Sequence, residues 1–312
     1  MSTPSRHPQV NPFLAIIFGI LAVSTASIFI RYAQAFAPSL VIAAWRLSLA
    51  TLVLTPAALT RYRPELKRMT RNELALGLLS GIFLAIHFAT WISSLEYTTV
   101  ASSVVLVSTS PLFVALLAPV FLKENISRQV VTGLVMSLVG ITVVAISDTC
   151  TWQNSSLVCP PVGAFLQGKA FLGDLLALAG ALAGACYITI GRRLRGGISV
   201  VSYIFVVYGM AAVVLVLVML VAGLNPFGFP PIAFLWFVLL ALVPQLLGHS
   251  TFNWALGYLS AAFVSLTLLG EPIGSTILAY FLLHETPTGL KVIGAILILA
   301  GIMVASRSEK TG

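Results

Sequence analysis

Long apolar runs alternate with short polar segments along the whole chain. A membrane-spanning helix needs about 20 mostly apolar residues to cross a hydrocarbon core of roughly 30 Å. Runs of this length, bounded by charged residues or by Pro and Gly, predict ten spans, at residues 13–30, 40–59, 73–95, 100–122, 127–146, 172–191, 200–222, 232–256, 260–283 and 288–305. The pattern therefore predicts an all-α integral membrane protein with ten transmembrane helices.

Composition agrees with this prediction and excludes a soluble domain. Of the 312 residues, 59% are hydrophobic and 8% are charged, against roughly 25% charged residues in an average soluble domain. The mean hydropathy is +1.03. Seventeen Lys and Arg against nine Asp and Glu give a net charge of +8, which in a soluble protein would point to nucleic acid. Here the excess is typical of the cytoplasmic loops of a membrane protein, so we expect no nucleic-acid partner.

The basic residues also predict the orientation. An even number of spans puts both termini on one side, and the loops of that side carry most of the charge, on Arg6, Arg61, Arg63, Lys67, Arg68, Arg71, Lys123, Arg128, Arg192, Arg193, Arg195, Arg307 and Lys310. The opposite loops carry only Arg31, Lys169 and Lys291. Since basic loops stay inside, we expect a multi-pass protein of the cell (inner or plasma) membrane with cytoplasmic tails at 1–12 and 307–312.

The chain repeats itself at an offset of 161 residues. Residues that membrane composition alone would not align are superposed without a gap: Gly19 on Gly180, Arg31 on Arg192, Tyr97 on Tyr258, Pro111 on Pro272, Glu124 on Glu285, Gly133 on Gly294 and Gly140 on Gly301. This predicts a first five-helix repeat at 13–146 and a second at 172–306, joined by an extracytoplasmic loop at 147–171. The first span could also be a cleaved signal peptide, but its internal copy favours its retention.

Five spans in each copy mean that the second copy enters the membrane from the opposite side. Inverted repeats are a recurring design of secondary transporters, whose solute site lies near the membrane midplane between the halves. The predicted architecture therefore favours a carrier over a receptor or an enzyme.

Polar residues at membrane depth are costly unless they face a bundle interior or a wet cavity. Gln245, His249 and Asn253 share one face of the eighth span, and His87 and Trp91 share one face of the third. We take His87, Trp91, His249 and Asn253 as solute-binding candidates; buried structural hydrogen bonds are the alternative. Further candidates are the rings of Trp45 and Trp254, the ionisable side chains of Arg46 and Glu271, and the hydroxyl of Ser110. Trp also populates membrane interfaces.

Two prolines interrupt equivalent spans. Pro111 follows Ser110, and Pro272 follows Glu271. Because Pro removes an intrahelical hydrogen bond, we predict hinges at Pro111 and Pro272. Glu271 is the only acid near mid-span, so it is the candidate for proton coupling, with a histidine as the alternative. An ion pair between Glu271 and Arg46 is compatible with their depths. We expect the cavity walls from the first, third, fourth, sixth, eighth and ninth spans, and the fifth and tenth spans at the periphery.

The remaining signals are weaker. Cys150 and Cys159 lie in the predicted outer loop, an oxidising compartment, and are close enough in sequence for a disulfide. Glu124 and Glu285 stand just ahead of Ser127 and Thr286, where they would cap helix starts. No metal-ligand, nucleophile or phosphate-binding motif is found, so we expect no metal and no cofactor.

Several strings carry a family resemblance. They are Ala44-Trp45-Arg46-Leu47, His87 to Trp91, Leu95-Glu96-Tyr97-Thr98, Ser110-Pro111-Leu112-Phe113, Lys123-Glu124, Gly248-His249, Asn253-Trp254-Ala255-Leu256, Leu269-Gly270-Glu271-Pro272 and His284-Glu285. Nearly the whole chain resembles the EamA family of the drug/metabolite transporter superfamily, and within it YddG-like exporters of aromatic and neutral amino acids. The resemblance implies a ten-helix basket around a central cavity, export of amino acids or related metabolites, and Tyr97 among the site residues.

The predicted function is therefore a secondary transporter that takes a small-molecule solute across the bilayer by alternating access, as a monomer or weak dimer. A carrier of phosphate-bearing solutes from the same superfamily is one alternative, which should place several Lys or Arg in the cavity. An intramembrane enzyme is another, but the motifs it would need are missing. The sequence leaves the solute and the coupling ion open.

Overall fold

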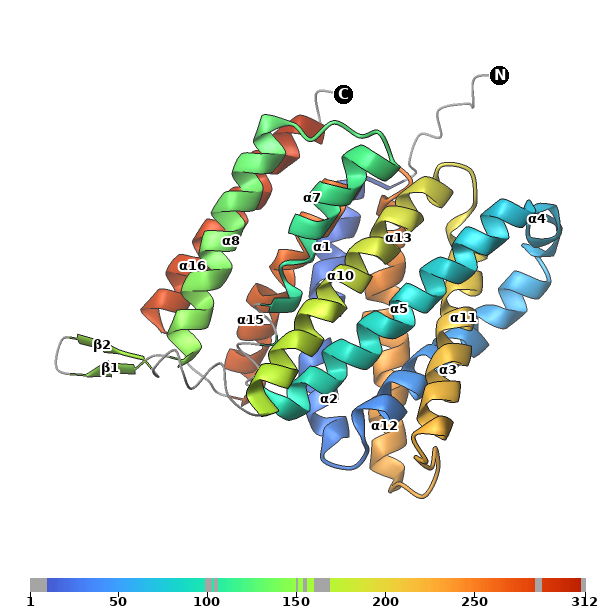
Figure 1. The fold of residues 1–312 in the computed structure, drawn as a ribbon, viewed down its shortest axis with the longest axis horizontal. Coiled ribbons are helices and arrows are strands. Elements are labelled where there is room, and N and C mark those ends of the chain that lie inside the picture. The colour runs from blue at the N-terminus through green and yellow to red at the C-terminus, as the bar shows by residue number, and fades with distance from the viewer. Residues whose placement is uncertain are drawn as a thin grey trace.

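The computed structural model describes residues 10–98, 103, 106–149, 151–153, 156–159, 169–283 and 288–309. Figure 1 shows a bundle of helices packed side by side. The helices of the first half are α1 (Pro12–Val23), α2 (Ala26–Gln34), α3 (Ser39–Leu59), α4 (Arg63–Arg68), α5 (Arg71–Tyr97), α7 (Ser110–Phe121) and α8 (Arg128–Thr149). Those of the second half are α10 (Lys169–Arg195), α11 (Val200–Val221), α12 (Pro231–Leu240), η1 (Ala241–His249), α13 (Ser250–Ala255), α14 (Ala261–Thr267), η2 (Leu268–Gly270), α15 (Glu271–Leu283) and α16 (Gly289–Glu309).

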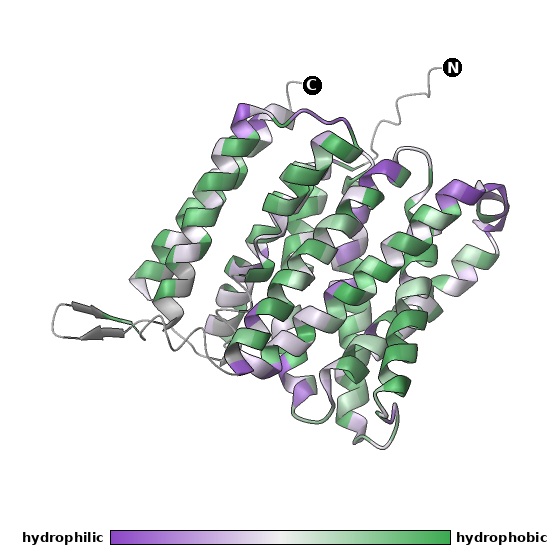
Figure 2. Cartoon of the chain, viewed as in Figure 1, coloured by the Kyte–Doolittle hydropathy of each residue, from purple (hydrophilic) through white to green (hydrophobic). Residues whose placement is uncertain are grey.

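The helices are apolar along their length and polar at their ends, as Figure 2 shows. Among the described residues, seven stretches are long and apolar enough to cross a membrane: Pro12–Gln34, Ser39–Leu59, Arg71–Tyr97, Phe171–Arg195, Val200–Val221, Pro231–Ala255 and Ala261–Leu278. Three shorter apolar helices, Ser110–Phe121, Arg128–Val143 and Val292–Ser308, overlap the other predicted spans. The chain is thus a helical membrane protein, and the count of ten spans stays a prediction.

Local sequence sets where several helices begin. Thr70 and Glu73 form a capping box at the start of α5, in which the Thr70 hydroxyl accepts from the Glu73 amide and the Glu73 carboxylate accepts from the Thr70 amide. At α11, the amide of Ser199 donates to Glu65 of α4 at 2.8 Å. These bonds satisfy amides that a helix start leaves without an intrahelical partner.

Two helical stretches are interrupted. Between α1 and α2, the hydroxyls of Ser24 and Thr25 donate to the carbonyls of Ile20 and Ala22 at 2.7 and 2.8 Å, in competition with the helix amides. In the eighth predicted span, the π-helix η1 contains Pro244, which has no amide hydrogen to donate. Wide turns of this kind occur mostly as short insertions in α-helices and often at functional sites.

Two pairs of long helices pack closely against each other. At one edge of the bundle α8 packs along α16, and both also contact α14 (Figure 1). Glycines let these two backbones approach: a Cβ on Gly133 would lie 2.4 Å from the carbonyl oxygen of Gly301, and one on Gly140 would lie 2.7 Å from that of Gly294. In the centre α5 packs along α10. The peripheral position of α8 and α16 is the one that the sequence predicted.

The connection between the halves holds the one departure from an all-helical chain in the described residues. Strands β1 (Thr151–Gln153) and β2 (Ser156–Val158) pair antiparallel, with Thr151 opposite Val158. The all-α prediction holds for the other described elements and missed this hairpin, because six residues of loop are too short to give a periodicity that distinguishes a strand from coil. Cys150, one member of the predicted disulfide, lies outside the described residues.

Candidate functional site

A pocket in the centre of the bundle collects polar side chains from both halves of the chain. Its volume is about 80 Å³, below the roughly 300–1,000 Å³ of typical ligand pockets. The described residues that line it include His87, Trp91, Ser110, Pro111, Gly184, Tyr187, His249, Asn253, Ser265 and Glu271. They come from α5, α7, α10, α13, α14, α15 and the end of η1, and we call this space the central pocket.

α5 contributes His87 and Trp91 to the central pocket, one helical turn apart. The Nδ1 atom of His87 lies 2.8 Å from the carbonyl oxygen of Gly180, and the imidazole stacks on Trp91 with 5.9 Å between ring centroids. Gly184 of α10 leaves room for this ring, since a Cβ there would lie 2.9 Å from Nδ1. The imidazole is therefore fixed by its neighbours, whereas the indole Nε1 of Trp91 is buried with no hydrogen-bond partner among the described residues.

The two proline positions frame the central pocket from opposite halves. α7 begins at Ser110, with Pro111 at its second residue, and α15 begins at Glu271, followed by Pro272. The Ser110 hydroxyl is buried and has no partner within the described part of the chain. The backbone carbonyl of Glu271 accepts from the Ser24 hydroxyl at 3.2 Å. Each proline thus stands at a helix start, where its missing amide leaves no intrahelical bond unmade.

Asn253 joins the central pocket to a group of phenols. Its side-chain amide donates to Tyr187 Oη at 2.5 Å and to Tyr208 Oη at 3.3 Å. Sequence reasoning missed both tyrosines, although a phenol in the middle of an apolar span was a usable signal. His249, one turn before Asn253, packs its ring against Phe88 with centroids 5.3 Å apart.

Arg46 lies beneath the central pocket rather than in its wall. Its Nε donates to Gln245 Oε1 at 2.8 Å, and its guanidinium stands 4.2 Å from the centroid of the Phe88 ring. The side chain is fully buried. Its Nη1 and Nη2 atoms, with Nε2 of Gln245, have no hydrogen-bond partner among the described residues. No ion pair joins Arg46 to Glu271 in that part of the chain.

Besides Arg46, the structure places three other predicted site residues outside the central pocket. Trp45 donates from Nε1 to the carbonyl of Pro226 at 2.8 Å and lies among phenylalanine rings. Trp254 packs on Tyr258 and lines a second, more open pocket of about 730 Å³. Tyr97 is exposed at the end of α5. Hydropathy gives the depth of a ring but not the direction in which it leaves its helix, which explains these placements.

The first span does not line the central pocket, contrary to our expectation. Its serines bond to α15 instead: Ser275 Oγ donates to the carbonyl of Ser24 at 2.9 Å, and Ser27 Oγ donates to Ser275 Oγ at 3.3 Å. These bonds satisfy the hydroxyls at membrane depth, where such groups cost free energy if left unpaired. No cluster of three or more His, Cys, Asp or Glu that could hold a metal occurs within the described ranges.

Comparison with known proteins adds the family. The model of the EamA-like transporter family matches residues 11–146 and again residues 171–307. The chain belongs to the EamA-like transporter family. The two matched segments are the two halves whose side chains meet in the central pocket, so both copies of the family unit supply its walls.

Relatives of this EamA-like chain are named as transporters and exporters. It is 24% identical to the uncharacterized transporter YyaM of Bacillus subtilis, over 85% of this chain and 83% of that protein. It is 24% identical to the pseudopaline exporter CntI of Pseudomonas aeruginosa, over 95% of this chain and 96% of that protein. A probable terminal-alkyne amino-acid exporter of Streptantibioticus cattleyicolor is 27% identical, over 65% of this chain and 62% of that protein.

A solved crystal structure shares the fold. It matches with a TM-score of 0.74 at 20% sequence identity, over 96% of this chain and 98% of the solved chain. At this identity the likeness concerns the fold alone.

Proposed function

We propose that this transporter exports amino acids or closely related small metabolites across the cytoplasmic membrane by alternating access. The observation that carries the proposal is the central pocket, in which His87 and Ser110 of the first half face Asn253 and Glu271 of the second. A site shared between repeats is typical of secondary transporters. The relative named as an amino-acid exporter supports the choice of solute.

We further propose that the halves are inverted five-span repeats, at 13–146 and 172–306, within a ten-span chain. The contact between α8 and α16 supports this. Gly133 faces Gly301, and Gly140 faces Gly294; the 161-residue offset turns the first of these contacts into the second. A two-fold axis exchanges the two copies, so each contact across the axis occurs twice with the partners exchanged. The two glycine contacts between α8 and α16 form such a pair.

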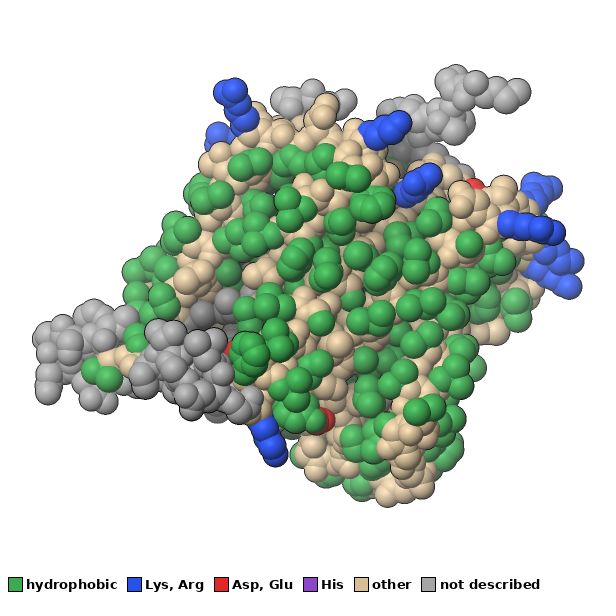
Figure 3. Space-filling model, viewed as in Figure 1, with side chains coloured by type: hydrophobic (Ala, Val, Ile, Leu, Met, Phe, Trp, Pro, Cys, Tyr) green, Lys and Arg blue, Asp and Glu red, His purple; other side chains and the backbone are tan. Residues whose placement is uncertain are grey.

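Both termini are assigned to the cytoplasm. α1 begins and α16 ends at one end of the bundle, which we call the terminal face (Figure 1). In Figure 3 most of the visible Lys and Arg side chains gather at this end, and apolar side chains cover the body of the molecule. Basic residues on one face of a membrane protein favour the cytoplasmic side for that face.

The chemistry of the central pocket suits a zwitterion. Glu271 offers a carboxylate to an ammonium group, while Trp91 Nε1 and Ser110 Oγ offer unpaired hydrogen-bonding atoms to a carboxylate. The buried guanidinium of Arg46 adds positive charge beneath them. None of the described lining residues is Lys or Arg, and a site for phosphate would need such residues.

The small volume of the central pocket implies a narrowed state. About 80 Å³ leaves room for a few water molecules but not for an amino acid, so the halves must separate on one side for the solute to bind. Alternating access supplies this change, since rocking one repeat against the other widens the midplane site toward one face at a time.

Transport by purified protein in proteoliposomes tests the proposed solute. We expect uptake of radiolabelled neutral or aromatic amino acids and none of sugar phosphates. Trp91→Phe and Ser110→Ala should each weaken transport by removing one hydrogen-bonding atom, on the order of tenfold or less. Trp236→Phe is the matched control, because Trp236 stacks on Tyr32 outside the central pocket. Uptake of sugar phosphates alone would overturn the amino-acid assignment.

Glu271 is proposed as the proton-coupling residue. Gln keeps the shape and hydrogen bonding of Glu but cannot titrate, so Glu271→Gln should abolish accumulation driven by a proton gradient and preserve counterflow exchange. Wild-type accumulation in the Glu271→Gln protein would refute coupling through this residue and leave the carrier assignment intact. Loss of both activities would instead assign Glu271 to solute binding.

A further inference from the structure

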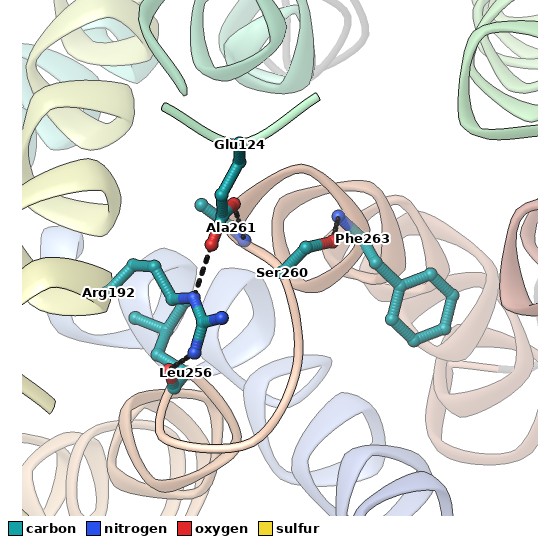
Figure 4. Close-up of polar contacts among 6 residues, drawn as sticks. All are labelled: Glu124, Arg192, Leu256, Ser260, Ala261 and Phe263. Atoms are coloured by element: carbon teal, nitrogen blue, oxygen red, sulfur yellow. Dashed lines mark hydrogen bonds and ion pairs between the residues drawn. The ribbon is translucent and has the colours of Figure 1, made fainter. Parts of the chain in front are cut away.

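An ion pair joins the two halves at the terminal face, and Figure 4 shows its side chains with the groups around them. Glu124 belongs to the segment between α7 and α8, and Arg192 to the last turn of α10. The Nε of Arg192 lies 2.6 Å from Glu124 Oε1, and the two side chains are 27% and 19% exposed, Arg192 first. We refer to this contact as the Glu124–Arg192 ion pair.

The same two side chains hold backbone groups of the second half. Arg192 Nη1 donates to the carbonyl of Leu256, just after α13, at 2.9 Å. Glu124 Oε2 accepts from the amide of Ala261, the first residue of α14, at 3.2 Å. A carboxylate at a helix start and a guanidinium at a helix end both lie where the helix dipole favours their charge.

The sequence placed Glu124 as a cap for the helix that follows Ser127, whereas its carboxylate lies at the start of α14. The start of α8 is served by Ser127, whose hydroxyl accepts from the Val130 amide at 3.1 Å. Lys123 has a left-handed backbone with a φ of 57°, which turns the chain at the end of α7. Glu124 is therefore free to reach across to α14 and α10 of the other half.

The ion pair lies next to the wall of the central pocket. Leu256, whose carbonyl accepts from Arg192, also lines the pocket, and so do Val264 and Ser265, one turn along α14 from Ala261. A path from the terminal face to the pocket would open where the segment that carries Glu124 meets α10 and α14. Opening it would separate Glu124 from Arg192 and Ala261. Arg31, which the repeat aligns with Arg192, is exposed on the opposite face, and Glu285, which it aligns with Glu124, lies outside the described residues.

We propose that the Glu124–Arg192 ion pair closes the central pocket toward the terminal face and breaks when the pocket opens to that side. The proposal rests on the proposed alternating-access mechanism but not on the identity of the solute. A partly exposed ion pair suits this role, because both charges regain water when they separate and the contact is therefore reversible.

Access to a pocket residue tests the proposal. Ser265→Cys, in a Cys186→Ala background, provides a thiol in the wall of the central pocket. A membrane-impermeant maleimide is added to the terminal face in oriented vesicles, and labelling of position 265 is followed by mass spectrometry. Glu124→Gln and Arg192→Gln should each speed labelling from this face by roughly three- to tenfold, since each removes hydrogen bonds to a charged group.

Three comparisons make the result decisive. Arg193→Gln removes the same charge from the neighbouring, exposed residue of α10 and should label at the wild-type rate. The double variant Glu124→Gln/Arg192→Gln should label little faster than either single variant, since both remove one shared contact. Arg192→Lys keeps the charge and should fall between Arg192→Gln and wild type.

Unchanged labelling in folded Glu124→Gln and Arg192→Gln proteins, or equal acceleration by Arg193→Gln, would overturn the proposal. If Glu124→Gln does not fold, Arg192→Lys and Arg192→Gln give the same test. Labelling requires no solute, so faster labelling without amino-acid transport would refute only the proposed solute. Amino-acid transport with unchanged labelling would refute only the role of the ion pair.

Discussion

Two helix crossings that the repeat makes equivalent have different backbones. In the first, α5 and α10 are both continuous helices of 27 residues. In the second, the aligned residues form α1 and α2 on one side and α12, η1 and α13 on the other, so both partners are interrupted. The two crossings still share contacts: Gly180 packs on Thr90 and Trp91, and Gly19 packs on the aligned Thr251 and Phe252.

Single residues account for the difference. Ser24 and Thr25, whose hydroxyls bond to carbonyls of α1, align with Ala185 and Cys186 in α10. Pro244 in η1 aligns with Phe83 in α5. Ala, Cys and Phe leave the helical ladder complete, whereas hydroxyls compete for its acceptors and Pro removes a donor. One crossing therefore consists of continuous helices, and the other contains breaks at which a bend can occur.

The largest effect, a loss of stability, is expected when a larger side chain is placed between the continuous helices α5 and α10. Gly184→Val would place its side chain against the His87 ring, which Gly180 and Trp91 hold in place. Overpacking of this kind costs about 1–3 kcal/mol, so we expect a lower melting temperature and less monodisperse protein. In the other crossing the residues aligned with Gly184 and His87 are Val23 and Gly248, which pack against each other. The double variant Gly184→Val/His87→Gly copies that pair and should regain most of the thermal stability. A double variant no more stable than Gly184→Val would contradict this packing.

The next effect comes from making the interrupted crossing continuous. Pro244→Ala restores a backbone donor, and since Pro inside a helix costs about 3 kcal/mol, the melting temperature should stay or rise. Transport should fall strongly, because the bend would be lost. Pro119→Ala, at an exposed position of α7, is the control and should keep transport. Full transport by the Pro244→Ala protein would show that the π-helical segment is not a hinge.

A smaller effect is expected at the break between α1 and α2. Ser24→Ala copies the aligned Ala185 and removes the bonds to Ile20 and to the Glu271 carbonyl. The loss of stability should be about 1 kcal/mol, measured as a shift in melting temperature, with a moderate fall in transport rate. Ser306→Ala, an exposed hydroxyl near the end of α16, should change neither. If both substitutions had equal effects, the hydrogen bonds of Ser24 would not account for the difference between the two crossings.

The smallest effect on transport is expected in the connection between the halves, away from both crossings. Cys150 and Cys159 directly flank Thr151 and Val158, which pair in the hairpin, so we expect a disulfide between them. Alkylation followed by mass spectrometry, with and without reduction, should reveal it in protein kept under oxidising conditions. Cys150→Ser/Cys159→Ser should transport normally. Free labelling of both thiols without reduction would exclude the bond.

The sequence alone predicted the membrane helices and the repeat, and it selected the polar residues along them. Burial in lipid depends mainly on local composition, so hydropathy predicted helices such as α3, α5 and α11 with small errors at their ends. Pro111 and Pro272 were also selected from sequence, and both lie at helix starts; the hinges expected there stay a prediction. His87, Trp91, His249, Asn253 and Glu271 were selected by helical phase, and the structure brings them to one pocket.

Tertiary structure decided the partners. The rotation of each helix about its axis placed Trp45 and Trp254 outside the central pocket and Arg46 beneath it, although their depth in the membrane was predicted. Tyr187 and Tyr208 meet Asn253 only because α10, α11 and α13 converge. The helix start that Glu124 contacts was likewise decided by the tertiary structure, since a carboxylate can cap any helix start within reach. Such contacts depend on which helices pack together, and this is set by the summed side-chain shapes of the bundle rather than by any local pattern.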